Sequence, residues 1–166
     1  PFLYPVGGEQ PAPEVPAPVP VPEVDEDDTL DAEVAVYDPF GDGTESDDRA
    51  GLVFDGNRFT AWQTEAYSQP LRQFKDGVGL VFTVDGSPSA VYVTGTAGTT
   101  YLVGWERSLP DDPSAWEDVA RGTLQESETR IQLPVRSGGI WRLWLTSLPE
   151  QPDGSYQARI TEVRFV

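Results

Sequence analysis

From residue 33 to its end, the chain consists of short runs that alternate apolar and polar residues, separated by Gly, Pro, Asp or Ser. Leu80, Phe82 and Val84 share one parity of their run, and Leu143 and Leu145 do so in another. A period of two places such residues on one face of a β-strand, and no stretch offers a long helix of period 3.6. The predicted strands cover residues 33–37, 78–84, 89–95, 100–106, 129–133, 140–146 and 156–166. Short strands at this spacing predict an all-β fold, an antiparallel sandwich or jelly roll.

Three segments leave this pattern open or break it. Residues 46–54 could hold a short helix, and residues 114–120 could form one helical turn or a short strand. In the last predicted strand, the apolar positions change parity between Ile160 and Val163. A β-bulge between them would bring both sets to one face, and it would redirect the side chain of Glu162.

Charge divides the chain into two parts. Residues 1–48 contain 14 Asp or Glu and no Lys or Arg, whereas residues 49–166 contain 11 Lys or Arg and 14 Asp or Glu. Half of the 16 prolines lie within the first 22 residues, where they favour extended polyproline II. We therefore predict a disordered, Pro-rich acidic tether over residues 1–30 and one folded domain over residues 31–166. The net charge of −17 argues against a nucleic-acid partner.

The missing residue types narrow the possible chemistry. The chain has no His, Cys or Met, which excludes disulfides, Cys nucleophiles, Ser-His-Asp triads and zinc sites built on His or Cys. The neighbouring acids Asp111 and Asp112, like Glu117 and Asp118, would point to opposite faces of a strand and so would not face each other as a glycosidase pair. We expect no enzymatic activity. No apolar run is long enough to span a bilayer, so any membrane attachment would come from segments outside this chain.

Two segments resemble a known fold family. Residues 53–62 contain the series D-G-N-R-F-T-A-W, and residues 158–166 end the chain as A-R-I-T-E-V-R-F-V. The first resembles the D-G-x-x-x-T-x-W signature of galactose-binding-like, discoidin-type domains, and the second resembles their closing strand. The resemblance implies a galactose-binding-like jelly-roll β-sandwich over residues 31–166.

The same resemblance implies a structural calcium ion. The positions that match the family's usual ligands are Asp55, Asn57 and Thr60 in one turn and Glu162 in the last strand. Carboxylate, amide and hydroxyl oxygens are ligands that Ca²⁺ accepts. The alternative is that Asp55 and Thr60 hold the turn by hydrogen bonds to the backbone without a metal.

A narrower resemblance rests on four motifs. They are D-P-F-G-D at 38–42, T-E-A-Y-S at 64–68, K-D-G-V-G-L at 75–80 and W-L-T-S-L-P at 144–149. Together they resemble the extracytoplasmic C-terminal domain of actinobacterial MurJ/MviN proteins, the lipid II flippases of peptidoglycan synthesis. This implies a non-catalytic module, tethered at the outer face of the plasma membrane, that binds cell-wall glycan or a cell-wall synthesis protein.

The candidate ligand-binding residues are aromatic and basic side chains on or near predicted loops. They are Tyr67, Phe74, Trp105 and Trp116, with Arg72 and Lys75 beside the first two. Trp62 and Trp141 are predicted to be core residues, and Trp144 could be either. If these aromatic residues were buried, a protein–protein scaffold with no sugar affinity would be the better interpretation. The acidic loop of Asp38, Asp42, Glu45, Asp47 and Asp48 favours a solvated loop over a metal site.

Overall fold

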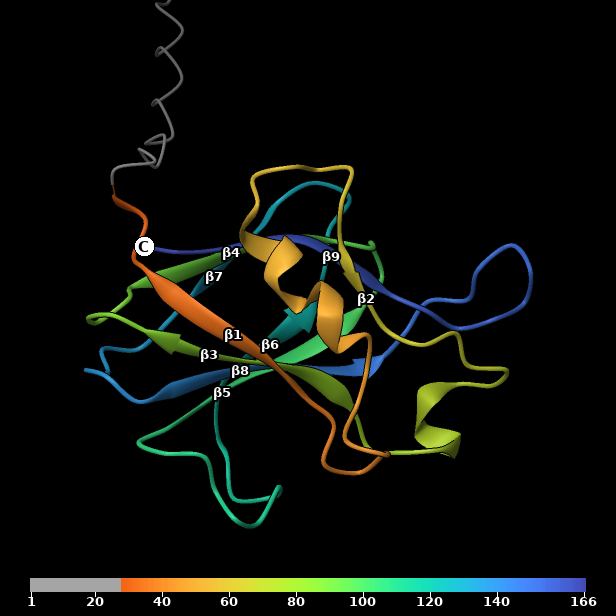
Figure 1. The fold of residues 1–166 in the computed structure, drawn as a ribbon, viewed down its shortest axis with the longest axis horizontal. Helices are drawn as coiled ribbons and strands as arrows, with labels where there is room; N and C mark the ends of the chain where they lie inside the picture. The colour runs from red at the N-terminus through yellow and green to blue at the C-terminus, as the bar shows by residue number, and fades with distance from the viewer. Residues whose placement is uncertain (1–27) are drawn as a thin grey trace, which may run out of the picture.

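The computed structural model describes residues 28–166, which fold into two antiparallel sheets packed face to face (Figure 1). One sheet has the strand order β1-β3-β8-β5-β6 and the other has the order β2-β9-β4-β7. The strands are β1 (Ala32–Tyr37), β2 (Trp62–Gln63), β3 (Val78–Val84), β4 (Ala90–Gly95), β5 (Thr100–Glu106), β6 (Glu117–Thr123), β7 (Thr129–Gln132), β8 (Ile140–Ser147) and β9 (Arg159–Phe165). Two 3₁₀ helices, η2 (Asp47–Phe54) and η3 (Leu71–Gln73), lie in the connections. The all-β jelly-roll prediction is confirmed.

Alternation in the sequence explains which faces are buried. Leu80 and Phe82 of β3 and Trp141 and Leu143 of β8 point between the sheets, where they meet the apolar side of β9. Because Phe82 and Phe165 stack edge to face across the two sheets, with ring centroids 5.2 Å apart, they join the layers at the centre. Trp141 is completely buried, as predicted.

The 3₁₀ helix η2 covers one side of the sandwich, packed against β1, β2 and β9 (Figure 1). Val53 of this helix and Trp62 of β2 are fully buried. The Trp62 indole N–H donates to the carbonyl oxygen of Glu45 at 2.7 Å, which fixes the chain that leads into the helix. The short helix predicted for residues 46–54 and the core position of Trp62 are both confirmed.

Two features of the strands refine the predictions. Residues 117–123 form the edge strand β6, which settles the choice left open between a helical turn and a strand. In β9, Glu162 pairs with Thr94 but Ile160 pairs with Gly95, so Thr161 is the extra residue of a β-bulge, as expected.

A second, smaller cluster lies on the outer face of the five-stranded sheet. Tyr37, Trp116 and Trp144 are buried together there, and the guanidinium of Arg142 lies 4.9 Å from both indole rings. Arg142 also donates to Asp118 of the edge strand at 3.0 Å. Trp144, left open between core and surface, is therefore a buried residue of this outer cluster.

The beginning of the described chain joins the sheet closely. The backbone N–H of Leu30 donates to the carbonyl oxygen of Phe165 at 2.8 Å, and the Leu30 side chain packs against the core. Residues 1–27 of the predicted tether lie outside the described residues. Within residues 28–166, no helix has the length and apolar character needed to cross a membrane.

Candidate functional site

Four segments that are distant in sequence meet at one end of the sandwich. Asp38 directly follows β1, Glu45 precedes η2, Tyr67 follows β2, and Lys75 follows η3. The Lys75 ammonium donates to Asp38 Oδ1 at 2.8 Å and to Glu45 Oε2 at 3.3 Å. Both carboxylate side chains are fully buried, and the Lys75 side chain is nearly so. The result is a buried ion network with two acids and one base.

Tyr67 completes this network. Its hydroxyl lies 2.8 Å from Glu45 Oε1 and 3.0 Å from Glu45 Oε2, to which it donates. Glu45 Oε1 also accepts the backbone N–H of Glu65 at 2.6 Å. Since the carboxylate receives donors on both oxygens, its burial is compensated by hydrogen bonds.

Burial and neighbouring charges shift the pKa values of Glu45 and Lys75. Burial raises the pKa of Glu45, although the hydrogen bonds from Glu65 and Tyr67 and the charge of Lys75 oppose it. For Lys75, burial lowers the pKa, but the hydrogen bond to Asp38 and the charge of Glu45 outweigh it and leave the pKa above its ordinary value. Lys75 therefore stays cationic over the whole physiological range of pH.

Two aromatic rings lie beside the buried network, a half-buried Tyr67 that packs against the core and an exposed Phe74. The rings of Tyr67 and Phe74 lie 5.7 Å apart with an angle of 38° between their planes, and Phe74 is 53% exposed. The Lys75 ammonium lies 5.2 Å from the centre of the Tyr67 ring, and Arg72 is exposed on the adjoining helix η3. Four of the six predicted ligand-binding residues, Tyr67, Phe74, Arg72 and Lys75, thus come together; we call Tyr67 and Phe74 the aromatic pair.

Trp105 and Trp116 do not join the aromatic pair. Trp105 is paired with Trp141 near the N-terminal end of β8, and its indole N–H donates to the Gly138 carbonyl oxygen at 3.0 Å. The aromatic pair lies near the other end of β8, beyond the start of β3. Trp116 is only 7% exposed within the outer cluster, so the expectation that it lies accessible on a loop is wrong. The Trp116 ring packs directly on Gly104, which has no side chain to hold it away from the sheet, and this contact explains why Trp116 is buried.

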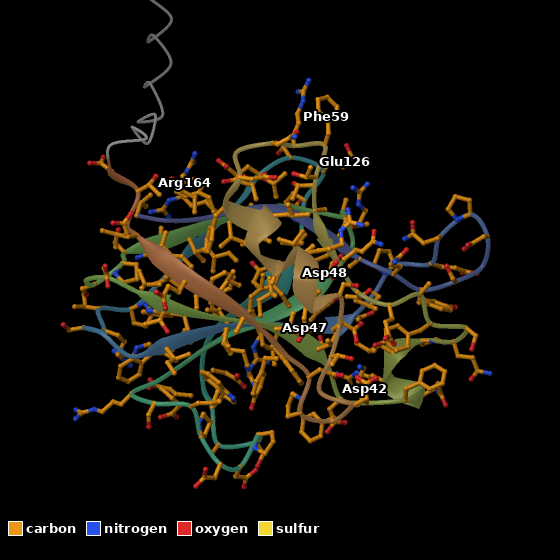
Figure 2. The ribbon with its side chains drawn as sticks, in the orientation of Figure 1. Asp42, Asp47, Asp48, Phe59, Glu126 and Arg164 are labelled. Atoms are coloured by element: carbon orange, nitrogen blue, oxygen red, sulfur yellow. The ribbon has the colours of Figure 1, made fainter. Side chains whose placement is uncertain are left out.

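The acidic loop also departs in part from the prediction of a fully solvated loop. Asp42, Asp47 and Asp48 are exposed, as expected for a solvated loop (Figure 2). Asp38 and Glu45 are instead buried against Lys75. Nothing local in the sequence marks these two acids, because their counter-ion follows them by 37 and 30 positions.

The predicted calcium residues meet at a different place. Asp55 Oδ1 accepts the Asn57 backbone N–H at 2.8 Å, and its other oxygen accepts the Thr60 hydroxyl. Burial raises the pKa of Glu162, and the negative charge of Asp55 adds to that rise while the Gly56 backbone N–H opposes it. The Asp55 turn and the bulged end of β9 are therefore neighbours, as the resemblance implies.

The side chains at this turn carry the types of oxygen atom that calcium accepts as ligands. Glu162 lies close enough to Asp55 for that negative charge to raise its pKa, although the charge of Arg164 opposes the rise, and an amide and a hydroxyl oxygen lie in the same turn as Asp55. A cation would relieve the repulsion between the carboxylates. The turn also holds itself: the hydrogen bonds of Asp55 are those expected of a metal-free Asp–Gly turn. In the described part of the chain, no cluster of three or more acidic side chains is placed to hold a metal, so most ligands would come from uncharged oxygens.

A groove of about 590 Å³ lies beside this turn rather than beside the aromatic pair. Its walls are Thr29–Ala32 at the start of the described chain and residues near the bulge, among them Arg58, Glu162 and Arg164. Neither Tyr67 nor Phe74 lines it. The groove and the aromatic pair are accordingly separate parts of the surface.

No protein-family model matches the chain. Solved structures do share its fold. A CBM32 module of the Clostridium perfringens protein CpGH89 has a TM-score of 0.53 at 16% identity, over 81% of this chain and 92% of that one. The fold is galactose-binding-like. A truncated AlyQ with CBM32 and alginate lyase domains matches with a TM-score of 0.53 at 15% identity, over 82% of this chain and 32% of that one.

A GH29 fucosidase of Ruminococcus gnavus, solved in complex with fucose, also contains the fold. Its TM-score is 0.56 at 15% identity, over 81% of this chain and 25% of that one. The galactose-binding-like domain thus spans only part of these larger proteins, and identities this low establish the fold alone.

The acids considered for glycoside cleavage are engaged elsewhere in this galactose-binding-like domain. Glu117 pairs with Arg136 and Asp118 pairs with Arg142, both along the edge strand β6. Asp112 caps its own turn by accepting the Ser114 backbone N–H at 2.9 Å. None of these three carboxylates faces another across a cleft as a general acid and base would.

Proposed function

We propose that the chain is a non-catalytic glycan-binding module whose contact surface is the aromatic pair with Arg72. The observation that carries the proposal is the rigid presentation of two rings at one end of a galactose-binding-like sandwich. Aromatic faces are electron-rich and attract the C–H groups of a sugar ring, and Arg72 supplies donors for hydroxyl groups. The structural neighbours support this choice, since two of them carry modules named for carbohydrate binding.

The form of the surface sets an expectation for affinity. The aromatic pair does not line the groove beside the Asp55 turn, so we expect a ligand on the pair to lose only part of its hydration on binding. Weak, millimolar-range binding of a few sugar rings is the outcome to expect. Exposed acids nearby, such as Asp42 and Asp76, would repel anionic polymers and tolerate neutral glycans.

The cellular setting belongs to the same proposal. We propose that the module lies outside the plasma membrane, beside growing peptidoglycan, because the four motifs resemble those of MurJ/MviN-type proteins. Three of these motifs contribute Asp38, Tyr67 and Lys75 to the network under the aromatic pair, and Gly77 and Trp144 of two motifs pack on each other. We propose that the ligand is a cell-wall glycan. A cell-wall synthesis protein is the second candidate, since the aromatic pair does not line the groove beside the Asp55 turn.

The decisive experiment compares two exposed phenylalanines. Purified sacculi are used for pull-down, and soluble muropeptides for titration by NMR chemical-shift perturbation. Phe74→Ala should abolish saturable binding. Phe59→Ala should leave it unchanged, because Phe59, 77% exposed with Arg58 over its ring, lies on a different side of the molecule from Asp42 (Figure 2).

Two results would oppose the glycan proposal. Equal losses in the Phe74 and Phe59 variants would mean that binding is non-specific adhesion to exposed rings. No shift in the intact protein at millimolar muropeptide would favour the protein-scaffold alternative, which cross-linking on living cells would then test through a partner lost on Phe74→Ala.

A further inference from the structure

We infer that Glu45 is a positioning residue: acting through the Tyr67 hydroxyl and together with Lys75, it fixes the orientation of the aromatic pair. The inference deepens the proposed function, because an oriented pair is what a sugar ring would stack on. Glu45 itself could not touch a ligand, since its side chain is fully buried.

The first step is that the Glu45 carboxylate is itself held in place. Its backbone carbonyl oxygen accepts the indole N–H of Trp62 at 2.7 Å, and Trp62 is a fully buried core residue. Its side chain receives the Glu65 backbone N–H at 2.6 Å and the Lys75 ammonium at 3.3 Å. Fixed at the backbone and at the carboxylate, Glu45 is a rigid extension of the core.

The second step leads from the carboxylate to the ring. The Tyr67 backbone exchanges two hydrogen bonds with Tyr156, at 2.9 and 2.8 Å, and its hydroxyl donates to Glu45 at the far end of the side chain. A ring held at both ends has a fixed axis. The plane of the ring is then set by its neighbours: Lys75 lies 5.2 Å from its centre and Phe74 packs beside it at 5.7 Å.

The third step concerns charge. Glu45 could not remain an ionised acceptor in this buried place without a cation, and Lys75 supplies it while also pairing with Asp38 at 2.8 Å. Gly41 lets the chain pass directly over Asp38, because a Cβ there would lie 2.2 Å from Asp38 Oδ2. The K-D-G motif thus provides Lys75, the counter-ion of Glu45. The D-P-F-G-D motif provides Asp38, which pairs with Lys75, and Gly41, which covers Asp38.

The test separates positioning from mere stability. Glu45→Gln keeps the size of the side chain and removes its charge, and Tyr67→Phe keeps the ring and removes the hydroxyl. In each variant, inter-ring NOEs between position 67 and Phe74 should weaken relative to the intact protein. Affinity for the muropeptide should fall about five- to tenfold, as expected for one lost charge-assisted hydrogen bond that preorganises a binding group.

A double-mutant cycle gives the sharper result. If Glu45 acts through the Tyr67 hydroxyl, Glu45→Gln should change affinity less than twofold in the Tyr67→Phe background. Asp118→Asn is the matched control, because it weakens another carboxylate–cation pair, that with Arg142, far from the aromatic pair. This control should leave both the NOEs and the affinity unchanged.

The outcomes are distinguishable from those of the proposed function. If the intact protein binds no muropeptide, the glycan proposal fails and the NOEs alone decide the positioning role. Unchanged NOEs in both single variants would overturn the inference, whatever happens to the melting temperature. Fully additive losses of affinity in the cycle would overturn it as well, and if Glu45→Gln does not fold, Tyr67→Phe decides the matter by its NOEs.

Discussion

Replacing Lys75 by Met removes the only cation of the buried network while nearly conserving the side-chain volume. Asp38 and Glu45 would then lie together, fully buried, without a counter-charge. In the native protein, the pKa of Lys75 lies above its ordinary value, so the lost group is cationic at pH 7 and at pH 5. The variant therefore isolates the effect of an uncompensated buried charge.

The magnitude follows from the burial of both partners. Removing one member of a buried ion pair costs about 3–5 kcal/mol, because the remaining charge keeps its desolvation penalty and loses its attraction. Here Glu45 can escape part of that penalty by taking up a proton, at about 1.4 kcal/mol for each pH unit above its pKa. We expect a loss of about 3 kcal/mol at pH 7, equivalent to a fall of roughly 10 °C in Tm for a domain of this size.

The pH dependence supplies an independent check. Burial already raises the pKa of Glu45 above its ordinary value of 4.5, so the folded state binds this proton more tightly than the unfolded state. Stability from this group therefore increases as pH falls from neutrality towards 4.5 and is lost as pH rises through the folded pKa. Without Lys75, the folded pKa rises further, and the deficit of Lys75→Met should shrink markedly between pH 7 and pH 5.

Thermal and urea unfolding of the two proteins at pH 7 and pH 5 measure both effects. Arg72→Met is the matched control, since Arg72 is exposed on the neighbouring helix η3 and should change stability by no more than about 0.5 kcal/mol. A loss below about 1 kcal/mol at pH 7, or a deficit that does not depend on pH, would refute the argument that Asp38 and Glu45 remain charged and buried.

Three further predictions concern other parts of the fold. If the Asp55 turn and Glu162 hold calcium, millimolar calcium should raise Tm relative to EGTA, and Asp55→Ala should abolish that response; identical melting curves in calcium and EGTA would contradict the calcium proposal. Gly79→Ala should cost about 3 kcal/mol in urea unfolding, because its Cβ would lie 1.9 Å from the Leu143 carbonyl oxygen in the adjacent strand, and a neutral result would contradict that close approach. Trp116→Ala should cost about 3 kcal/mol without changing muropeptide affinity, and a selective loss of affinity would restore Trp116 as a ligand-binding residue.

The sequence predicts a strand well where one face of the strand is apolar and the other is polar. The sequence predicts β3 and β5 over their full length because large apolar residues recur at every second position along them. It leaves the edge strand β6 open, since none of its residues is fully buried. β2 contributes only two residues, which is too short for any period to show.

The candidate site was predictable only in part, for a physical reason. Aromatic and basic residues in loops are visible in the sequence, and this pattern indicates Tyr67, Phe74, Arg72 and Lys75, although the structure buries most of the Lys75 side chain. The burial of Glu45 could not be predicted from the sequence, because an acidic residue among other acidic residues is typical of a solvated loop. Only the fold, by bringing Lys75 beneath that loop, shows which acids are compensated and can leave water.

The energetic balance of the network bears on why it lies at this end of the domain. A buried ion network gains little net stability over well-packed apolar residues, because desolvation offsets most of the attraction. Stability alone therefore gives no reason for Asp38, Glu45 and Lys75 to occupy this place. Apolar residues could fill the same volume, but they would offer the Tyr67 hydroxyl no acceptor and would leave its ring free to tilt. Directional hydrogen bonds fix one geometry at a site that an apolar core would leave adaptable, and a fixed geometry is what a stacking surface requires.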